Sequence, residues 1–128
     1  MIEAAITTII KNALNIDAYI GFIPEKAKRP AIAMETLGTV FNKTQQRYDY
    51  TKRDVIISLK LHANDVLQAK NLQNNIIRLF GQGYFVEDGI GYRYEILSSV
   101  IAAHDMFTPT DYSASVDIQL AIVETKIQ

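Results

Sequence analysis

Hydrophobic and polar residues alternate along two stretches of the chain. In the stretch 54–62, one set of positions is wholly apolar and the other set is mixed: Val55, Ile57, Leu59 and Leu61 against Ile56, Ser58, Lys60 and His62. In the stretch 113–127 the apolar set is Val116, Ile118, Leu120 and Ile122. Successive side chains of a strand point to opposite faces of a sheet, so both stretches predict strands with one covered face.

Two other stretches have apolar residues at helical spacing. Residues 2–14 carry a broad apolar face, and Asn15 is a residue that tolerates the left-handed conformation of a helix end. A second helix is predicted to begin near Asp65, which forms a capping-box pattern with Gln68, and to end at Gly81. Its polar side is mostly amides: Gln68, Lys70, Asn71, Gln73, Asn74, Asn75 and Arg78.

The remaining segments predict strands and turns. Residues 31–41 and 92–102 alternate well enough to be strands, and Asp88-Gly89 predicts a tight hairpin. Residues 42–52 are polar and predict a loop or the tip of a long hairpin, and 103–112 predict a loop around Pro109. Together these elements predict a single α+β domain over 1–128, with two amphipathic helices on one face of a mostly antiparallel sheet of about four long strands.

Composition narrows the function classes. The chain has 128 residues, 48% of them hydrophobic, and contains no cysteine, which excludes disulfides and thiolate chemistry and fits assembly in a reducing cytosol. The N-terminal apolar segment carries Glu3 and Lys11, so no signal peptide or membrane span is expected. With a formal net charge of −1, we do not expect the protein as a whole to attract nucleic acid through its electrostatic field.

Charge is unevenly distributed along the chain. Residues 26–53 are mainly basic, with Lys26, Lys28, Arg29, Lys43, Arg47, Lys52 and Arg53. After Phe80 the balance is acidic, with Glu87, Asp88, Glu95, Asp105, Asp111, Asp117 and Glu124. Either these charges form a solvated surface, or the basic side of one subunit meets the acidic side of the next in a head-to-tail ring.

Catalytic and cofactor motifs are not recognisable. Gly81 and Gly83 make up half of a dinucleotide fingerprint but follow a helix instead of opening one. His62 and His104 each have an aspartate nearby in sequence, but a metal site needs about three converging ligands. No G-x-S-x-G motif is present. We therefore expect no catalytic residue, metal or cofactor, although a small enzyme with its site between subunits stays open.

Tyr48 and Tyr50 lie among Arg47, Lys52 and Arg53. Aromatic and basic residues together suit single-stranded nucleic acid, through base stacking and phosphate contacts. Tyrosine is equally common on strands and at protein interfaces, so packing or partner contact is the other interpretation.

The order of these elements resembles the tail terminator and tail completion proteins of long-tailed bacteriophages. The resemblance covers nearly the whole chain and is carried by the following segments: "NALNIDAYI", "RPAIAMETLG", "RDVIISLKLHANDVLQAKNLQNNIIRLF", "DMFTPTD" and "YSASVDIQLAIVE". It implies a virion protein, assembled in the host cytoplasm, that forms a hexameric ring at the head-proximal end of the tail tube. Such a ring ends tube polymerisation and docks the tail to neck or connector proteins, with DNA passing through its lumen.

The polar segment 42–52 is longer than in some members of that family, which leaves another neck role, as stopper or adaptor, as an alternative. A nucleic-acid-binding module is a further one. Amides can hydrogen-bond across wet interfaces without the cost of burying charges. The candidate contacts to subunits, partners or the lumen are Lys43, Arg47, Tyr48, Tyr50, Lys52, Arg53, Gln68, Asn71, Asn75, Asp105 and Asp111.

Overall fold

The computed structural model describes residues 2–41 and 50–127. Strands make up more than half of these residues. In chain order the elements are α1 (Ile2–Leu14), β1 (Asp17–Ile20), β2 (Ala31–Phe41), β3 (Tyr50–Ala63), α2 (Val66–Phe80), β4 (Gln82–Asp88), β5 (Tyr92–Phe107) and β6 (Tyr112–Lys126).

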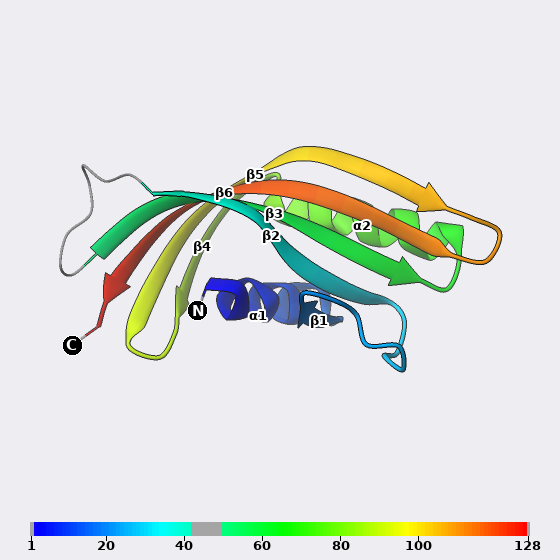
Figure 1. Cartoon of the computed structure of the whole chain (residues 1–128), viewed down its shortest axis with the longest axis horizontal. Coiled ribbons are helices and arrows are strands. Elements are labelled where there is room, and N and C mark those ends of the chain that lie inside the picture. Colours follow the sequence, from blue (N-terminus) through cyan, green and yellow to red (C-terminus); the bar gives the residue numbers. More distant parts are fainter. Residues whose placement is uncertain (1, 42–49, 128) are drawn as a thin grey trace.

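All six strands belong to one sheet, in the order β1-β2-β3-β6-β5-β4. Each neighbouring pair is antiparallel except β1 and β2, which are parallel. The sheet curls into a half-barrel that arches over the two helices (Figure 1). Strands β3 and β6 pair over their whole lengths, from Tyr50 opposite Thr125 to Ala63 opposite Tyr112.

The predicted α+β arrangement of two helices on about four long strands is wrong. The molecule is mostly sheet, with six strands and a strong curl. Strand β1 has only four residues, too few for a pattern of alternation. Strand β5 continues to Phe107, through half of the predicted loop 103–112, because its backbone pairs with β6 up to Tyr112. Backbone pairing does not require alternating side chains, so the sequence pattern missed it.

Both predicted helices and their ends are present. Asn15 follows α1 with a φ of 54°, in the left-handed region. At the start of α2, the Asp65 side chain accepts a hydrogen bond from the Gln68 backbone at 2.7 Å. In return, the Gln68 side chain accepts one from the Asn64 backbone at 2.7 Å. The two bonds satisfy N–H groups that have no partner within the helix.

Gly81 follows α2, but unlike Asn15 it does not end its helix by adopting a left-handed conformation. Its φ of −59° is right-handed, so the glycine is not needed for a positive φ. A Cβ at this position would lie 2.7 Å from the carbonyl oxygen of Ile77, which is closer than carbon and oxygen can approach. The chain can therefore turn directly from α2 into β4 only with glycine here.

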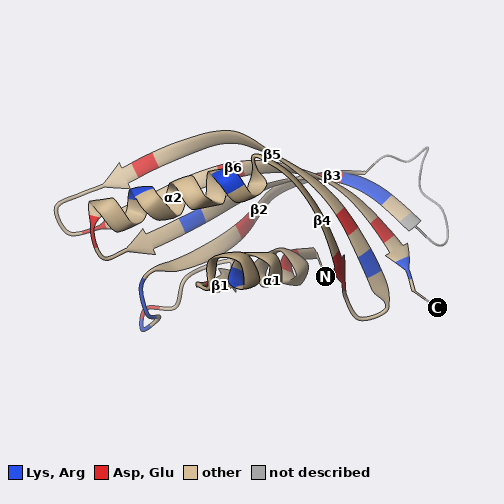
Figure 2. Ribbon diagram, turned by 180° about the vertical axis from the view of Figure 1, so that it is seen from behind, with Lys and Arg blue, Asp and Glu red and all other residues tan. Residues whose placement is uncertain are grey.

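The hydrophobic core lies between the concave face of the sheet and the helices. The predicted apolar sides of β3 and β6 are buried there, with Leu59 and Ile118 fully inaccessible. Helix α2 covers β3, β6, β5 and β4, and its Ile76 and Phe80 are also inaccessible. Figure 2 shows both helices on this side of the sheet. Helix α1 contacts β1 and β4, the two edge strands, and so bridges the opening of the half-barrel.

Candidate functional site: the uncovered face of the sheet

The other face of the sheet is covered by no element of the described chain. Strand register places its side chains in three rows that cross the strands, and we call these side chains the open face. The first row is Lys52, Val123, Glu95 and Val86; the second is Val40, Asp54, Ala121, Leu97 and Tyr84; the third is Ile56, Gln119, Ser99 and Gln82. None of them is buried.

Apolar side chains are unusually prominent on the open face. Leu97 is 58% exposed and Tyr84 is 60% exposed, and they lie side by side in the second row. Val40 and Ile56 are also exposed, from β2 and β3. Single exposed apolar residues are common on protein surfaces, but a contiguous group often marks an interaction site.

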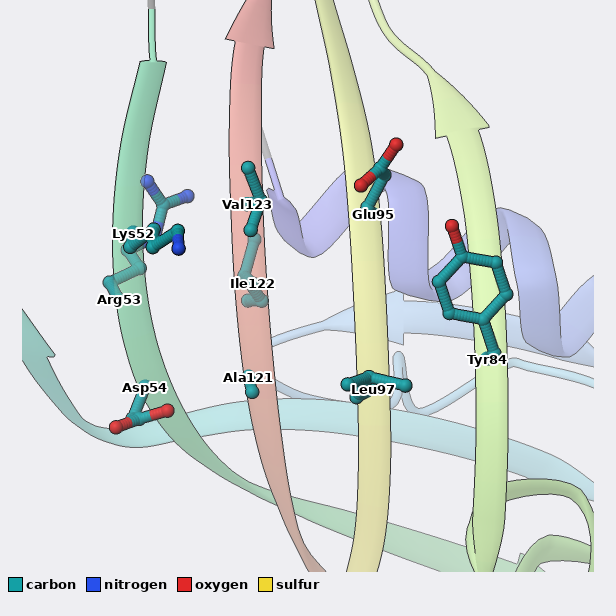
Figure 3. A pocket seen from close by; sticks show the side chains of 9 residues that line it. All are labelled: Lys52, Arg53, Asp54, Tyr84, Glu95, Leu97, Ala121, Ile122 and Val123. Carbon is teal, nitrogen blue, oxygen red and sulfur yellow. The ribbon is translucent and has the colours of Figure 1, made fainter. Parts of the chain in front are cut away.

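A groove of about 320 Å³ lies on this face, at the end of the sheet where β3 begins and β6 ends. Figure 3 shows Lys52, Glu95, Leu97 and Tyr84 on the side of the sheet away from α1. Ala121, Val123 and Leu97 contribute apolar surface near its middle. Polar groups flank them: Lys52 and Asp54 on β3, Glu95 on β5 and the Tyr84 hydroxyl on β4. An apolar centre with a polar rim is the usual composition of a binding surface.

Lys52 and Arg53 point to opposite faces because they are consecutive in a strand. Arg53 lies on the concave side, where its guanidinium is 2.9 Å from a Glu124 carboxylate oxygen and 6.0 Å from the centre of the Phe41 ring. The two paired side chains are only 12% and 20% exposed. The predicted basic contact surface is therefore divided, with Lys52 on the open face and Arg53 engaged inside its own subunit.

Tyr94 lies beside this ion pair on the concave face. Its side chain is buried, and among the described residues its hydroxyl has no hydrogen-bond partner. Burial, followed by the nearby Glu124 carboxylate, raises the pKa of Tyr94 to about 12. The hydroxyl is thus held in its neutral form throughout the ordinary pH range.

The two predicted acidic contacts have partners in their own chain. An Asp105 carboxylate oxygen is 3.0 Å from the ammonium of Lys70 on α2. Asp111 accepts a hydrogen bond of 2.7 Å from the Ser113 hydroxyl and lies 3.8 Å from the His62 ring. Together with Arg53 and Glu124, these pairs join basic residues to the acidic C-terminal half within one subunit.

The amides of α2 have three different roles. Gln73 is buried, and its side chain donates hydrogen bonds to the carbonyl oxygens of His104 and Ser115, so it belongs to the core. Gln68 is half-buried at the helix start, where it caps the backbone. Asn71 and Asn75 are exposed on the side of α2 away from the sheet. Asn74 is exposed as well, so these asparagines are the amides of α2 that are accessible for the contact that the sequence predicted.

Several predicted contacts cannot be placed. Lys43, Arg47 and Tyr48 lie outside the described residues, as does the part 42–49 of the predicted polar segment 42–52, whose last three residues belong to β3. Tyr50 begins β3, but its side chain is likewise outside the described part. Within residues 2–41 and 50–127, no helix is long and apolar enough to cross a membrane.

Side chains around His62 do not have the arrangement of a nucleophilic triad. The Ser113 hydroxyl is bonded to Asp111 and lies 3.4 Å from His62 Nδ1, so Ser and Asp share one side of the ring. A nucleophilic triad needs the serine and the acid on different ring nitrogens. In the part of the chain that the structure describes, no three histidine or acidic residues come together as metal ligands.

Sequence reasoning missed most of the groove. Leu97 and Tyr84 were interpreted only as parts of a strand and a hairpin, and Glu95 only as one of the many acidic residues after Phe80. One signal was present: Leu97 and Ile101 are apolar at positions that alternate with the buried side of β5, where solvent-facing residues are usually polar. The other groove residues come from separate strands, and only their register brings them together.

Comparison with protein-family models gives no match for this chain, and comparison with curated proteins gives none.

Proposed function

We propose that this protein is a structural subunit that associates head-to-tail into a ring at the head-proximal end of a phage tail tube. The observation that supports self-association is the open face, where Leu97 and Tyr84 are exposed side by side and Val40 is exposed in the same row on β2. The family resemblance of the sequence supplies the setting in a virion. The proposed role is to end tube polymerisation and to dock the tail to neck proteins.

A head-to-tail contact needs two different complementary surfaces on each subunit. The open face is one of them. The outer side of α2 is the second, and it lies on the opposite side of the sheet from the open face (Figure 2). It carries the exposed Leu67, Asn71, Asn75 and Arg78. Leu67 would cover apolar surface of the neighbour's groove, while the amides and Arg78 meet its polar rim.

This arrangement also gives the predicted amides a use. Asn71 and Asn75 can hydrogen-bond to a neighbour without the large desolvation penalty of a buried charge. Arg78 would lie close to Glu95 or Asp54 of the groove, since both carboxylates are exposed. The contact would be partly apolar and partly wet, as is usual for interfaces between subunits that also exist separately.

The test is to incubate purified protein with tail tubes and to image the tube ends by negative-stain electron microscopy. Wild-type protein is expected to form rings with a central hole at tube ends. Leu97→Asp is expected to abolish ring formation, because it places a charge in the apolar middle of the contact. Phe22→Asp is the matched control, since Phe22 is an exposed apolar residue in the loop after β1.

Circular dichroism must first show that both variants fold like the wild type. Rings that form equally well with Leu97→Asp would refute the use of the open face. A monomer that ignores tubes and binds single-stranded DNA with a steep salt dependence would instead favour the nucleic-acid module.

A further inference from the structure

We propose that, in the free protein, the open face is covered by the open face of a second copy, related by a two-fold axis that runs along β6. This pair is distinct from the proposed ring contact, which joins the open face to α2. The inference rests on the order of charges across the strands.

The first row of the open face has opposite charges on either side of an apolar centre. Lys52 and Glu95 both pair with Val123 in register, from the two strands that flank β6. Each therefore lies about 5 Å from β6, on opposite sides of it. Neither Lys52 nor Glu95 forms an ion pair within residues 2–41 and 50–127, whereas Arg53 next to Lys52 is paired with Glu124.

A two-fold axis parallel to β6 exchanges the two sides of the face. It brings Lys52 of each copy over Glu95 of the other, so two ion pairs form, while Val123 meets Val123 at the axis. A two-fold axis perpendicular to the strands and along this row would bring Lys52 over Lys52 and Glu95 over Glu95. Like charges opposed across an interface are strongly unfavourable, so the charge order selects the axis along β6.

The second row fits the same axis. Ala121 is paired with both Asp54 and Leu97, and so it lies at the centre, where its small side chain allows close approach. The open face is the convex side of the curled sheet, so the two copies approach most closely along β6, and the contact opens toward Val40 on β2 and Tyr84 on β4.

A two-fold pair of this kind is closed, because each open face is used once and none is left for a third copy. It therefore cannot grow into a ring, and ring assembly would require the pair to separate first. The free protein would hide its apolar groove in this way until it reaches a tail tube.

Charge reversal tests the pairing. Sedimentation equilibrium over a concentration series is expected to show a dimer for the wild type. Lys52→Glu or Glu95→Lys alone should raise the dimer dissociation constant by about tenfold or more, since each places like charges opposite one another. The double variant Lys52→Glu/Glu95→Lys should restore it to within about threefold of the wild type. Lys26→Glu, an exposed charge in the loop before β2, is the control and should change nothing.

Each other outcome would overturn the pairing. A monomer at all concentrations, or a dimer indifferent to both single reversals, would exclude it. Rescue of Lys52→Glu by Asp54→Lys instead of Glu95→Lys would exclude the axis along β6. If a reversed variant fails to fold, Lys52→Gln and Glu95→Gln are the milder substitutions and should each weaken the dimer. Rings formed by the free protein would exclude the pairing and support the proposed function, so the two ideas can fail separately.

Discussion

Ile56 and Ile57 are neighbours in β3, yet Ile57 is completely buried and Ile56 is 39% exposed. The same difference holds at the end of the sheet where β3 begins and β6 ends. The concave face is covered by α1 and α2 and holds the core, whereas the open face carries exposed apolar side chains that no described element covers. Identical residue types thus serve folding on one face and are available for association on the other. Substitutions on the two faces should affect different measurements.

The largest expected effect is on the concave face. Ile57→Ala should lower the free energy of unfolding by about 2 to 5 kcal/mol, because it removes buried methyl groups and leaves a cavity. Ile56→Ala should change it by less than about 1 kcal/mol, since its side chain is already in contact with water. Urea unfolding of dilute protein, followed by circular dichroism, measures both. Equal costs would show that the two faces do not differ as described.

The next effect concerns the ion pair at the end of the concave face. Arg53→Met should lower the free energy of unfolding by about 1 to 3 kcal/mol. The reason is that the Glu124 carboxylate, whose side chain is only 20% exposed, loses its partner. Adding Glu124→Leu should recover most of this loss, since no charge then remains to be desolvated. The same unfolding assay tests the cycle. If the double variant were as unstable as the single one, packing against Phe41 would be the main contribution of Arg53.

A smaller effect on the free energy of unfolding is expected at Gln73, a buried polar residue of α2. Gln73→Leu should cost about 1 to 2 kcal/mol, because the carbonyl oxygens of His104 and Ser115 lose their hydrogen-bond donor. Asn71→Leu on the exposed side of α2 is the control and should leave stability nearly unchanged. An equal result for both variants would mean that the amide of Gln73 is replaceable by water.

The smallest effect on the free energy of unfolding is expected for a substitution of Tyr94. Tyr94→Phe should leave stability at neutral pH unchanged or raise it by up to about 1 kcal/mol, because it removes a buried hydroxyl that has no hydrogen-bond partner within residues 2–41 and 50–127. The pKa of Tyr94 is about 12 in the folded protein, against an ordinary value of about 10. Its neutral form therefore stabilises the fold fully below pH 10, and this contribution is lost as pH rises toward 12.

Urea unfolding at several alkaline pH values separates the variant from the wild type. The wild type should lose stability between pH 10 and 12 more steeply than Tyr94→Phe. Parallel curves for the two proteins would show that Tyr94 does not titrate in this range.

The sequence was sufficient for those elements whose signal is local. Alternation in β3 and β6, the capping bonds of Asp65 and Gln68, and the left-handed Asn15 all depend on residues close in the chain. It was insufficient for β1 and for the extension of β5, which exist because a neighbouring strand supplies backbone partners.

The candidate site could be predicted even less well. Lys52 was named as a contact, but its companions in the groove lie on β4, β5 and β6, and register alone brings them together. Arg53 and Glu124 are 71 residues apart in the chain, so their pairing within one subunit could not be distinguished from pairing between subunits. Gln73 shares its residue type with exposed amides of the same helix, and only packing shows that it is buried.

Helix α1 touches both edge strands of the curled sheet, and this gives it a mechanical role. A half-barrel can open by flattening, which would move β1 and β4 apart. Because α1 contacts both strands, flattening the sheet would have to separate the helix from one of them. By holding β1 and β4 at a fixed separation, the helix maintains the curvature of the sheet. It should make the subunit stiff against a spreading force, while forces along the strands are resisted by the β3–β6 pairing instead.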